Sequence, residues 1–96
     1  MQKKCLQITV KGKVQGVSYR AATKAVADQL GVRGYIKNLD NGDVFMEAEA
    51  DKLTMDMFLD WCREGPEKAD ITLVDTHEAE IKNYRNFEIV KKSFQQ

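Results

Sequence analysis

The chain has 96 residues, 43% of them hydrophobic and 31% charged, and its 15 basic and 15 acidic side chains give a formal net charge of zero. This composition excludes intrinsic disorder, which needs fewer apolar residues and a larger net charge. It also argues against a nucleic-acid binder, which is normally basic because contacts to phosphate supply most of its affinity.

No segment of the sequence resembles a membrane span or a targeting signal. A transmembrane helix needs roughly 20 apolar residues and a secretory signal roughly 7–15, and the sequence contains no such run. A chain of roughly 100 residues is typical of one domain. We therefore expect a single domain over residues 1–96 that works in the cytoplasm, with neither a membrane nor a nucleic acid as partner.

The first third of the sequence predicts a strand followed by a helix. Apolar and polar residues alternate over 6–11, which is typical of a half-buried strand, and this strand runs into Gly12. Ser18 is the expected N-cap of a helix that ends at Gly31. Arg20 lies in the first turn, off the apolar stripe, so its guanidinium can turn towards the preceding loop. The stripe consists of Tyr19, Ala22, Val26 and Leu30.

A hairpin is expected in the middle of the chain. Its strands cover 32–39 and 44–50, and the Asp40-Asn41-Gly42 segment between them favours a tight turn because the Asn-Gly pair tolerates positive φ. The apolar residues that line one face of the later strand are Val44, Met46, Ala48 and Ala50.

A second helix and two further strands complete the pattern. The helix covers about 52–64 and ends at Gly65-Pro66, and strands follow over 71–81 and through Phe87 and Ile89. The apolar arc of the helix consists of Met55, Met57, Phe58, Leu59, Trp61 and Cys62. This order of elements predicts an α+β, ferredoxin-like two-layer sandwich (βαββαβ) with two helices on one face of an antiparallel sheet.

The segment VKGKVQGVSYR (residues 10–20) has the composition of an anion-binding loop. Glycines between a strand end and a helix start allow successive backbone N–H groups to converge on one point. The helix N-terminus and the planar fork of Arg20 add positive charge. The cradle residues would be Gly12, Gln15, Gly16, Val17, Ser18 and Arg20. On spacing alone, a tight connection with a solvated arginine remains an alternative, and the absence of a following Lys-Ser/Thr pair excludes a Walker A loop.

Two signatures in this sequence resemble those of the acylphosphatase family. Residues 10–20 closely resemble its first signature, and GYIKNLDNGDV (residues 34–44) resembles its second. The two occur in the family's order, the chain has the family's length, and NFEIV (residues 86–90) is similar to its last strand. The resemblance implies a monomeric enzyme that hydrolyses acyl phosphates to a carboxylate and inorganic phosphate, without metal or cofactor.

The same resemblance implies roles for particular residues. The family's phosphate-binding arginine maps onto Arg20, and its water-positioning asparagine maps onto Asn38. The amide of Asn38 does not titrate near neutrality, so it can hold a water molecule but cannot act as a base. The residues expected to bind the substrate phosphate are Gln15, Gly16, Val17, Ser18, Tyr19 and Arg20.

Three residues depart from the family's pattern. Tyr19 stands where phenylalanine is usual, Ile36 where a smaller residue is usual, and Ala50 where the second signature normally closes with glycine. None of them removes a group that takes part in the chemistry, so we expect effects on rate and fine geometry. The hydroxyl of Tyr19 is expected to have a partner near the loop.

Two rival functions stay open on the sequence. One is a non-catalytic module of the same fold, which would bind phosphate without turning over an acyl phosphate. The other is an RNA-binding sheet, which shares this order of elements but needs exposed aromatic residues in basic surroundings. Strand 44–50 offers only Phe45 beside glutamates, which argues against RNA binding.

The other chemistry-bearing residues suggest structural roles. Asp75 and His77 share a strand face and are expected to form a solvated edge, although two metal ligands are conceivable. Cys5 and Cys62 are expected to be reduced core thiols, and the sequence does not show whether they pair. Lys91 and Lys92 are interpreted as tail charges. A solvent-facing row of carboxylates is expected from Glu47, Glu49, Glu78 and Glu80.

Overall fold

The computed structural model describes residues 2–91, and its strands and helices follow one another in the predicted order. Each element begins and ends within a few residues of its expected bounds. The elements are β1 (Lys3–Lys13), α1 (Tyr19–Leu30), β2 (Arg33–Asn38), β3 (Val44–Asp51), α2 (Lys52–Glu64), β4 (Asp70–Ala79) and β5 (Phe87–Val90).

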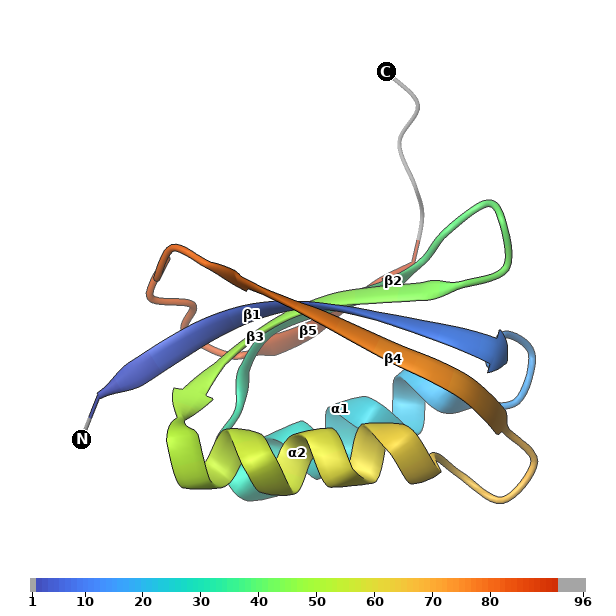
Figure 1. Cartoon of the computed structure of the whole chain (residues 1–96), viewed down its shortest axis with the longest axis horizontal. Coiled ribbons are helices and arrows are strands. Elements are labelled where there is room, and N and C mark those ends of the chain that lie inside the picture. The colour runs from blue at the N-terminus through green and yellow to red at the C-terminus, as the bar shows by residue number, and fades with distance from the viewer. Residues whose placement is uncertain (1, 92–96) are drawn as a thin grey trace.

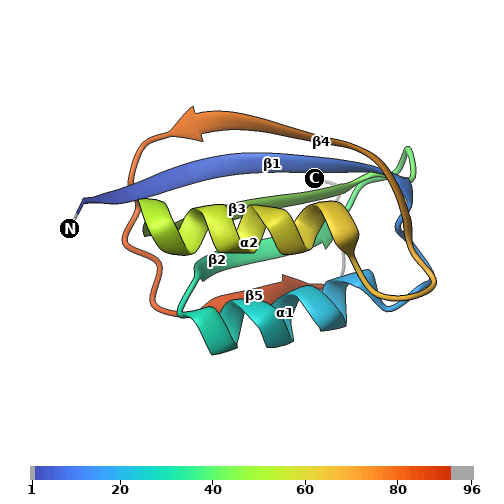
Figure 2. The ribbon, with the colours of Figure 1, turned by 60° about the horizontal axis from the view of Figure 1, so that its bottom comes forward.

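The sheet, seen nearly edge-on in Figure 1, has the strand order β4-β1-β3-β2-β5, which can be followed in Figure 2. Neighbouring strands are antiparallel except β2 and β5, which run parallel. Both helices pack on the same face of the sheet, as Figure 2 shows. The predicted ferredoxin-like sandwich is therefore confirmed, and β5 adds one parallel pair to an otherwise antiparallel sheet.

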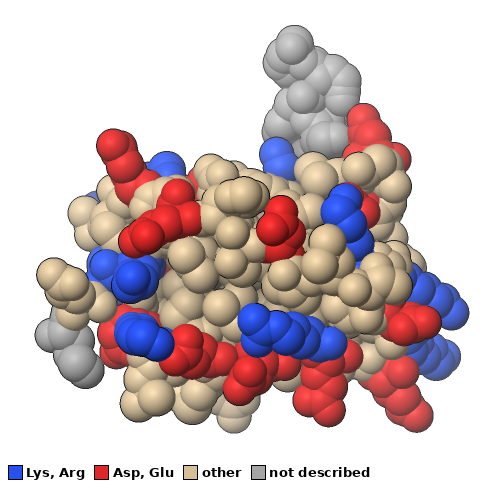
Figure 3. Space-filling view, in the orientation of Figure 1, with Lys and Arg blue, Asp and Glu red and all other residues tan. Residues whose placement is uncertain are grey.

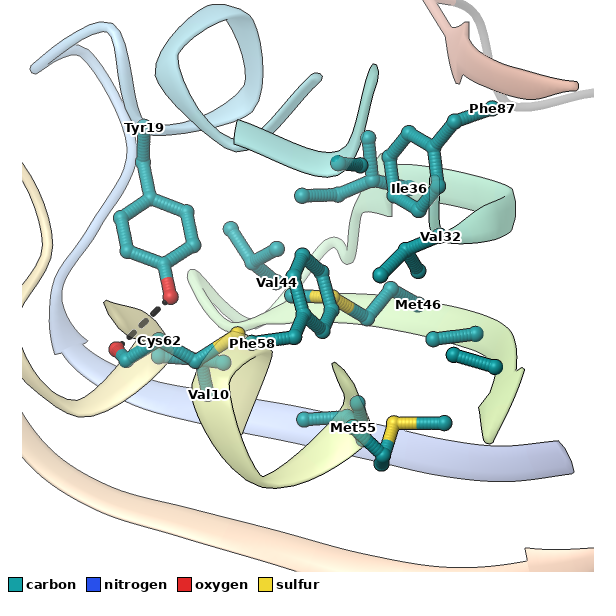
Figure 4. Packing of buried hydrophobic residues seen from close by; sticks show 14 of the residues in the cluster. Val10, Tyr19, Val32, Ile36, Val44, Met46, Met55, Phe58, Cys62 and Phe87 are labelled. Atoms are coloured by element: carbon teal, nitrogen blue, oxygen red, sulfur yellow. Dashed lines mark hydrogen bonds between the residues drawn. The ribbon is translucent and has the colours of Figure 1, made fainter. Parts of the chain in front are cut away.

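The hydrophobic core fills the space between the helices and the sheet (Figure 4). Phe58 of α2 packs edge-on against Phe87 of β5, with ring centroids 6.1 Å apart. Burial of side chains of this size contributes about 1.5–3 kcal/mol each. Met57, which we placed in the apolar arc of α2, is 45% exposed because the buried stripe of this helix is narrower than predicted. That stripe consists of Met55, Phe58 and Cys62.

The two cysteines are both buried thiols and do not form a disulfide. Cys62 belongs to the core between the helices and the sheet. Cys5 lies on β1 three residues before the core residue Ile8, so the alternation of the strand points its side chain to the opposite, helix-free face. The expectation of reduced thiols is confirmed, but only Cys62 is part of the main core.

The surface of the described residues carries charges of both signs. Basic and acidic side chains are interspersed over the face seen in Figure 3. Asp75 and His77 are exposed on the edge strand β4, with the His77 ring Nε2 3.2 Å from an Asp75 carboxylate oxygen. Among residues 2–91, neither helix is long and apolar enough to span a membrane.

Two of the four carboxylates that we expected to face solvent are buried. Glu47 and Glu49 are only 4% and 1% exposed, because the segment 80–86 between β4 and β5 folds over the helix-free face. The Glu49 carboxylate accepts hydrogen bonds from the backbone N–H groups of Lys82, Asn83 and Tyr84, at 2.5, 3.1 and 3.0 Å. Glu78 and Glu80 are exposed as predicted.

Glu47 is held by side chains rather than by backbone groups. Its carboxylate accepts hydrogen bonds from the Tyr84 hydroxyl and from Gln7 Nε2, at 2.5 and 2.9 Å, and lies 3.1 Å from Lys82 Nζ. Burial alone would raise the pKa values of Glu47 and Glu49, but their hydrogen bonds outweigh it and both pKa values are lowered. Both carboxylates are therefore ionised in the folded protein at neutral pH.

The hydrogen bonds from the backbone of residues 82–84 to the Glu49 carboxylate, which we call the Glu49 clamp, predict that stability falls in acid. The folded-state pKa of Glu49 lies below its ordinary value of 4.5, so the unfolded chain takes up the proton first and stability is lost as the pH falls below about 4.5. Glu49→Gln should lower the free energy of unfolding at neutral pH by roughly 1.5–3 kcal/mol and flatten this acid dependence. Urea unfolding at several pH values measures both effects.

Glu78→Gln is the matched control, because Glu78 is exposed and lies 3.8 Å from Lys4 in a surface ion pair. It should change the stability by less than about 0.5 kcal/mol. Equal stability of the Glu49→Gln variant and the wild type at neutral pH would contradict the Glu49 clamp.

Candidate active site

Three strands end at the same edge of the sheet. β1 and β2 are both antiparallel to β3, so they run in the same direction, and β5 runs parallel to β2. The three strands therefore end at the same end of the sheet, which is on the right-hand side of Figure 1. Their last residues are Lys13, Asn38 and Val90. Helix α1 also begins at this end, because a short loop connects it to β1.

A pocket of about 450 Å³ lies at this end of the molecule. It brings together Asn38 and the predicted phosphate-binding loop. Of the residues expected to bind the phosphate or to act in catalysis, all but Val17 line the pocket, and the Val17 side chain packs against the core instead. The lining consists of Val14, Gln15, Gly16, Ser18, Tyr19, Arg20, Ala21, Asn38, Ile89 and Lys91. Within the described residues this lining contains two cationic side chains and no carboxylate.

The loop between β1 and α1 contains two residues in the left-handed backbone conformation, which is common where backbone N–H groups form an anion-binding nest. Gly16 and Ser18 have positive φ values of 74° and 63°. Within residues 2–91, the backbone N–H groups of residues 15–20 have no hydrogen-bond partner. Ser18 occupies the predicted N-cap position of α1, but its side chain makes no capping hydrogen bond. These donors are therefore available to a ligand.

Gly12, which we included in the cradle, has a different role. It lies within β1, at a register shift in the pairing of β1 with β4, and does not line the pocket. Its φ is 123°, and a Cβ atom at this position would lie 2.1 Å from the carbonyl oxygen of Asp70. Glycine is required here for a β-bulge rather than for binding.

Tyr19 anchors the start of α1 to α2. Its ring is 1% exposed and lies 5.4 Å from the Trp61 ring, and its hydroxyl donates a hydrogen bond of 2.9 Å to the carbonyl oxygen of Cys62 (Figure 4). Burial raises the pKa of this hydroxyl, so it stays protonated and can donate. The expected partner of the hydroxyl is thus a carbonyl of the last turn of α2 rather than a group of the loop itself.

Arg20 connects the pocket to the end of β5. Its side chain lines the pocket, and its Nη1 donates a hydrogen bond of 3.0 Å to the carbonyl oxygen of Val90. A guanidinium carries five N–H donors. The bond to Val90 fixes the position of the guanidinium and leaves further donors for a ligand in the pocket.

Asn38 contributes an unsatisfied acceptor to the pocket. It is the last residue of β2 and pairs with Val44 of β3. Its side-chain Oδ1 is buried and has no hydrogen-bond partner among residues 2–91. Buried polar atoms are nearly always hydrogen-bonded in native proteins. An unpaired amide oxygen in this position suits a water molecule or ligand in the pocket.

The sequence patterns missed four residues of the pocket wall, of which Val14 and Ala21 flank the predicted loop and the other two lie at and just after the end of the chain's last strand. Ile89 and Lys91 line the pocket, whereas we had interpreted Lys91 as a tail charge. Its position follows from the parallel pairing of β5 with β2, which places the residues after Val90 beside the end of β2. No local periodicity signals such a pairing. Lys92, given the same interpretation, lies outside the described residues.

The remaining chemistry-bearing side chains do not form a second centre. No three His, Cys, Asp or Glu side chains within residues 2–91 are close enough together to hold a metal ion. Burial raises the pKa of Cys62 to about 12 and also raises the pKa of Cys5. Both thiols are therefore protonated at neutral pH and are poor nucleophiles.

Comparison with known proteins identifies the family. The family model described as acylphosphatase matches residues 6–89. The chain belongs to the acylphosphatase family. An acylphosphatase of Archaeoglobus fulgidus is 45% identical over 84 residues, which cover 88% of this chain and 94% of the relative.

Solved structures agree with this assignment. The structure of an acylphosphatase from Coxiella burnetii is 33% identical, with a TM-score of 0.88 over 92% of this chain and 93% of that one. The acylphosphatase from Bacillus subtilis is 28% identical, with a TM-score of 0.88 over 91% and 98%. The resemblance seen in residues 10–20 and 34–44 is therefore confirmed.

Two of the departures from the acylphosphatase pattern lie away from the pocket. Ile36 and Ala50 are 0% and 7% exposed and belong to the core between the helices and the sheet. Neither lines the pocket. They alter the packing beneath the site rather than the groups that face it.

The left-handed backbone of Ser18 predicts the effect of replacing it. This conformation costs a residue other than glycine roughly 1–2 kcal/mol, and the greater freedom of glycine in the unfolded chain offsets part of that gain. Because the Ser18 side chain makes no capping hydrogen bond, Ser18→Gly should raise the free energy of unfolding by about 0.5–1 kcal/mol. Ser18→Ala removes only the hydroxyl and should change it by less than about 0.5 kcal/mol. Loss of stability in both variants, measured by urea unfolding, would show that the hydroxyl stabilises the helix.

Proposed function

We propose that this pocket is where the chain hydrolyses acyl phosphates, the reaction of the acylphosphatase family. In this proposal the backbone N–H groups of residues 15–20 and the guanidinium of Arg20 hold the phosphate, and Asn38 positions the attacking water. The observation that supports it best is the convergence of unpaired backbone donors, a cation and an unpaired amide oxygen on one pocket. These are the groups that a phosphoryl anion and a water molecule require.

The cradle would act by stabilising charge. Phosphoryl transfer passes through a loose transition state whose negative charge is spread over three equatorial oxygens. Preorganised N–H donors stabilise such charge without reorganisation during the reaction. Arg20 would contribute a full positive charge and paired donors to two phosphate oxygens.

Asn38 would act on the water molecule. Its Oδ1 would accept a hydrogen bond from the water and orient the water oxygen in line with the phosphorus and the bond that breaks. The water oxygen forms the new bond to phosphorus as the bond between phosphorus and the acyl oxygen breaks, and a carboxylate leaves. The proton of the water would pass to a phosphate oxygen of the substrate, so the reaction needs no titrating side chain.

Further features of the enzyme are proposed with the site. We propose a monomer that works in the cytoplasm, without metal or cofactor and without a nucleic-acid partner. The balanced charge argues against a nucleic-acid partner, and one pocket of the described residues is lined by Arg20, Asn38 and most of the loop residues. The substrate is a small acyl phosphate that enters this pocket phosphate first.

Replacement of Arg20 tests the phosphate site. Arg20→Gln should lower kcat by about 10³–10⁵, as for other arginines that stabilise phosphoryl transfer. The release of inorganic phosphate from a small aryl acyl phosphate, in the presence of a chelator, is the measurement. Arg33→Gln is the control, because Arg33 is an exposed residue of β2 that does not line the pocket. Near wild-type turnover by Arg20→Gln would refute the role of Arg20.

Replacement of Asn38 tests the positioning of water. Asn38→Ala should lower kcat by about 10²–10³, as for other amides that stabilise or orient reacting groups. KM should change little because the cradle and Arg20 remain. The exposed Asn86 provides the control variant Asn86→Ala, which should keep full turnover. A rise in KM at constant kcat would instead make Asn38 a residue that binds substrate.

A further inference from the structure

The side chain of Gln15 connects the phosphate-binding loop to the β2–β3 hairpin. Its Nε2 donates hydrogen bonds of 2.8 Å to the carbonyl oxygen of Leu39 and 2.9 Å to that of Asp43. Both donors of this amide are therefore engaged by backbone carbonyls, and Gln15 is partly buried. The side chain cannot also donate to a phosphate, so only the backbone N–H of Gln15 remains for the cradle.

The two carbonyls lie on either side of the hairpin turn. The Leu39 N–H donates to the Asp43 carbonyl at 2.8 Å, and the Gly42 N–H donates to the Leu39 carbonyl at 3.2 Å. The amide of Gln15 thus inserts at the point where β2 and β3 separate and bonds to both arms of the turn. It fixes the end of β2 relative to the loop that precedes α1.

Asn38 is the residue just before the first of these arms. No hydrogen bond joins its side chain to another residue within the described part of the chain, and its Oδ1 is buried without a partner. Its position in the pocket is therefore set by the backbone of β2 and by the attachment of the hairpin base. Gln15 provides that attachment from within the phosphate-binding loop.

We propose that Gln15 is a positioning residue that sets the place of Asn38 relative to the bound phosphate. The inference rests on the proposed function of Asn38. Gln15 belongs to both halves of the site, since its backbone N–H lies in the cradle and its side chain holds the hairpin that carries Asn38. Displacement of a reacting group by about 1 Å can cost about 10² in rate, so such an attachment affects turnover directly.

Other contacts maintain the hairpin without Gln15. Lys11 Nζ lies 2.6 Å from an Asp43 carboxylate oxygen, and Asn41 Oδ1 accepts a hydrogen bond of 3.0 Å from the Asp43 N–H. Each carbonyl bonded by Gln15 also keeps a backbone donor from the turn itself. Removal of the Gln15 amide should therefore leave the protein folded, with Tm lowered by about 4–8 °C.

A double-mutant cycle on kcat tests the proposal. Gln15→Met keeps the length of the side chain and removes its donors, and it should lower kcat by about 10–100-fold while changing the inhibition constant of inorganic phosphate by less than about threefold. In the Asn38→Ala background the same substitution should lower kcat by less than about twofold, because the group that Gln15 positions is already absent. Lys11→Met, which removes a contact to the same turn from outside the pocket, should keep kcat within about twofold of the wild type.

The outcomes distinguish a failure of the proposal for Gln15 from a failure of the proposed function of Asn38. Losses in kcat that multiply in the double variant would overturn the role of Gln15 and leave that of Asn38 intact. A parallel rise in the inhibition constant of phosphate in Gln15→Met would also overturn it, because Gln15 would then act through the cradle. Full turnover by Asn38→Ala would refute the role of Asn38, and the inference about Gln15 with it.

Discussion

The backbone N–H groups of residues 15–20 must stay unpaired if an anion is to use them, and the surrounding chain is built to meet this requirement. Unpaired backbone donors cost free energy, and a loop without internal hydrogen bonds has many alternative conformations. Three side chains of this segment attach it to the surrounding elements. Tyr19 bonds to α2, Gln15 to the β2–β3 hairpin and Arg20 to the end of β5. The shape of the cradle is thus set by tertiary contacts with three different elements.

All three contacts use backbone carbonyls at the ends of elements. The last turn of a helix and the last residues of a strand carry carbonyls that lack a partner within the element. Cys62 lies in the last turn of α2 and Val90 is the last residue of β5, whereas Leu39 directly follows β2 in the hairpin turn. Because β1, β2 and β5 run in the same direction, the strand ends gather beside the start of α1. The topology therefore supplies the donors of the site and also the acceptors that hold its side chains.

Local patterns predicted the elements well because each pattern depends on neighbours in the sequence. Alternation over 6–11 and the stripe of α1 correspond to β1 and α1 within a few residues. Asn38 was identified differently, through the resemblance of residues 34–44 to a family signature. Periodicity alone marks it only as a polar residue before a turn.

Apart from the exposure of Met57, the main errors concern contacts between distant segments. Glu47 and Glu49 alternate with apolar residues like solvent-facing strand charges, but a segment more than thirty positions away covers them. Gly12 looks like part of the cradle until the register of β4 shows a bulge. Lys91 reaches the pocket through the parallel pairing of β5. Such contacts depend on the path of the chain in space, which no local periodicity encodes.

The two faces of the sheet are connected through β5. On the helix-free face, Glu49 holds the backbone of residues 82–84. A backbone hydrogen bond of 2.8 Å from the Gly34 N–H to the Asn86 carbonyl then fixes the entry into β5. Four residues later, β5 ends at the carbonyl that accepts the hydrogen bond from Arg20. A carboxylate that does not line the pocket therefore helps to fix the strand that holds the guanidinium, which gives a structural reason for burying a charge on the helix-free face.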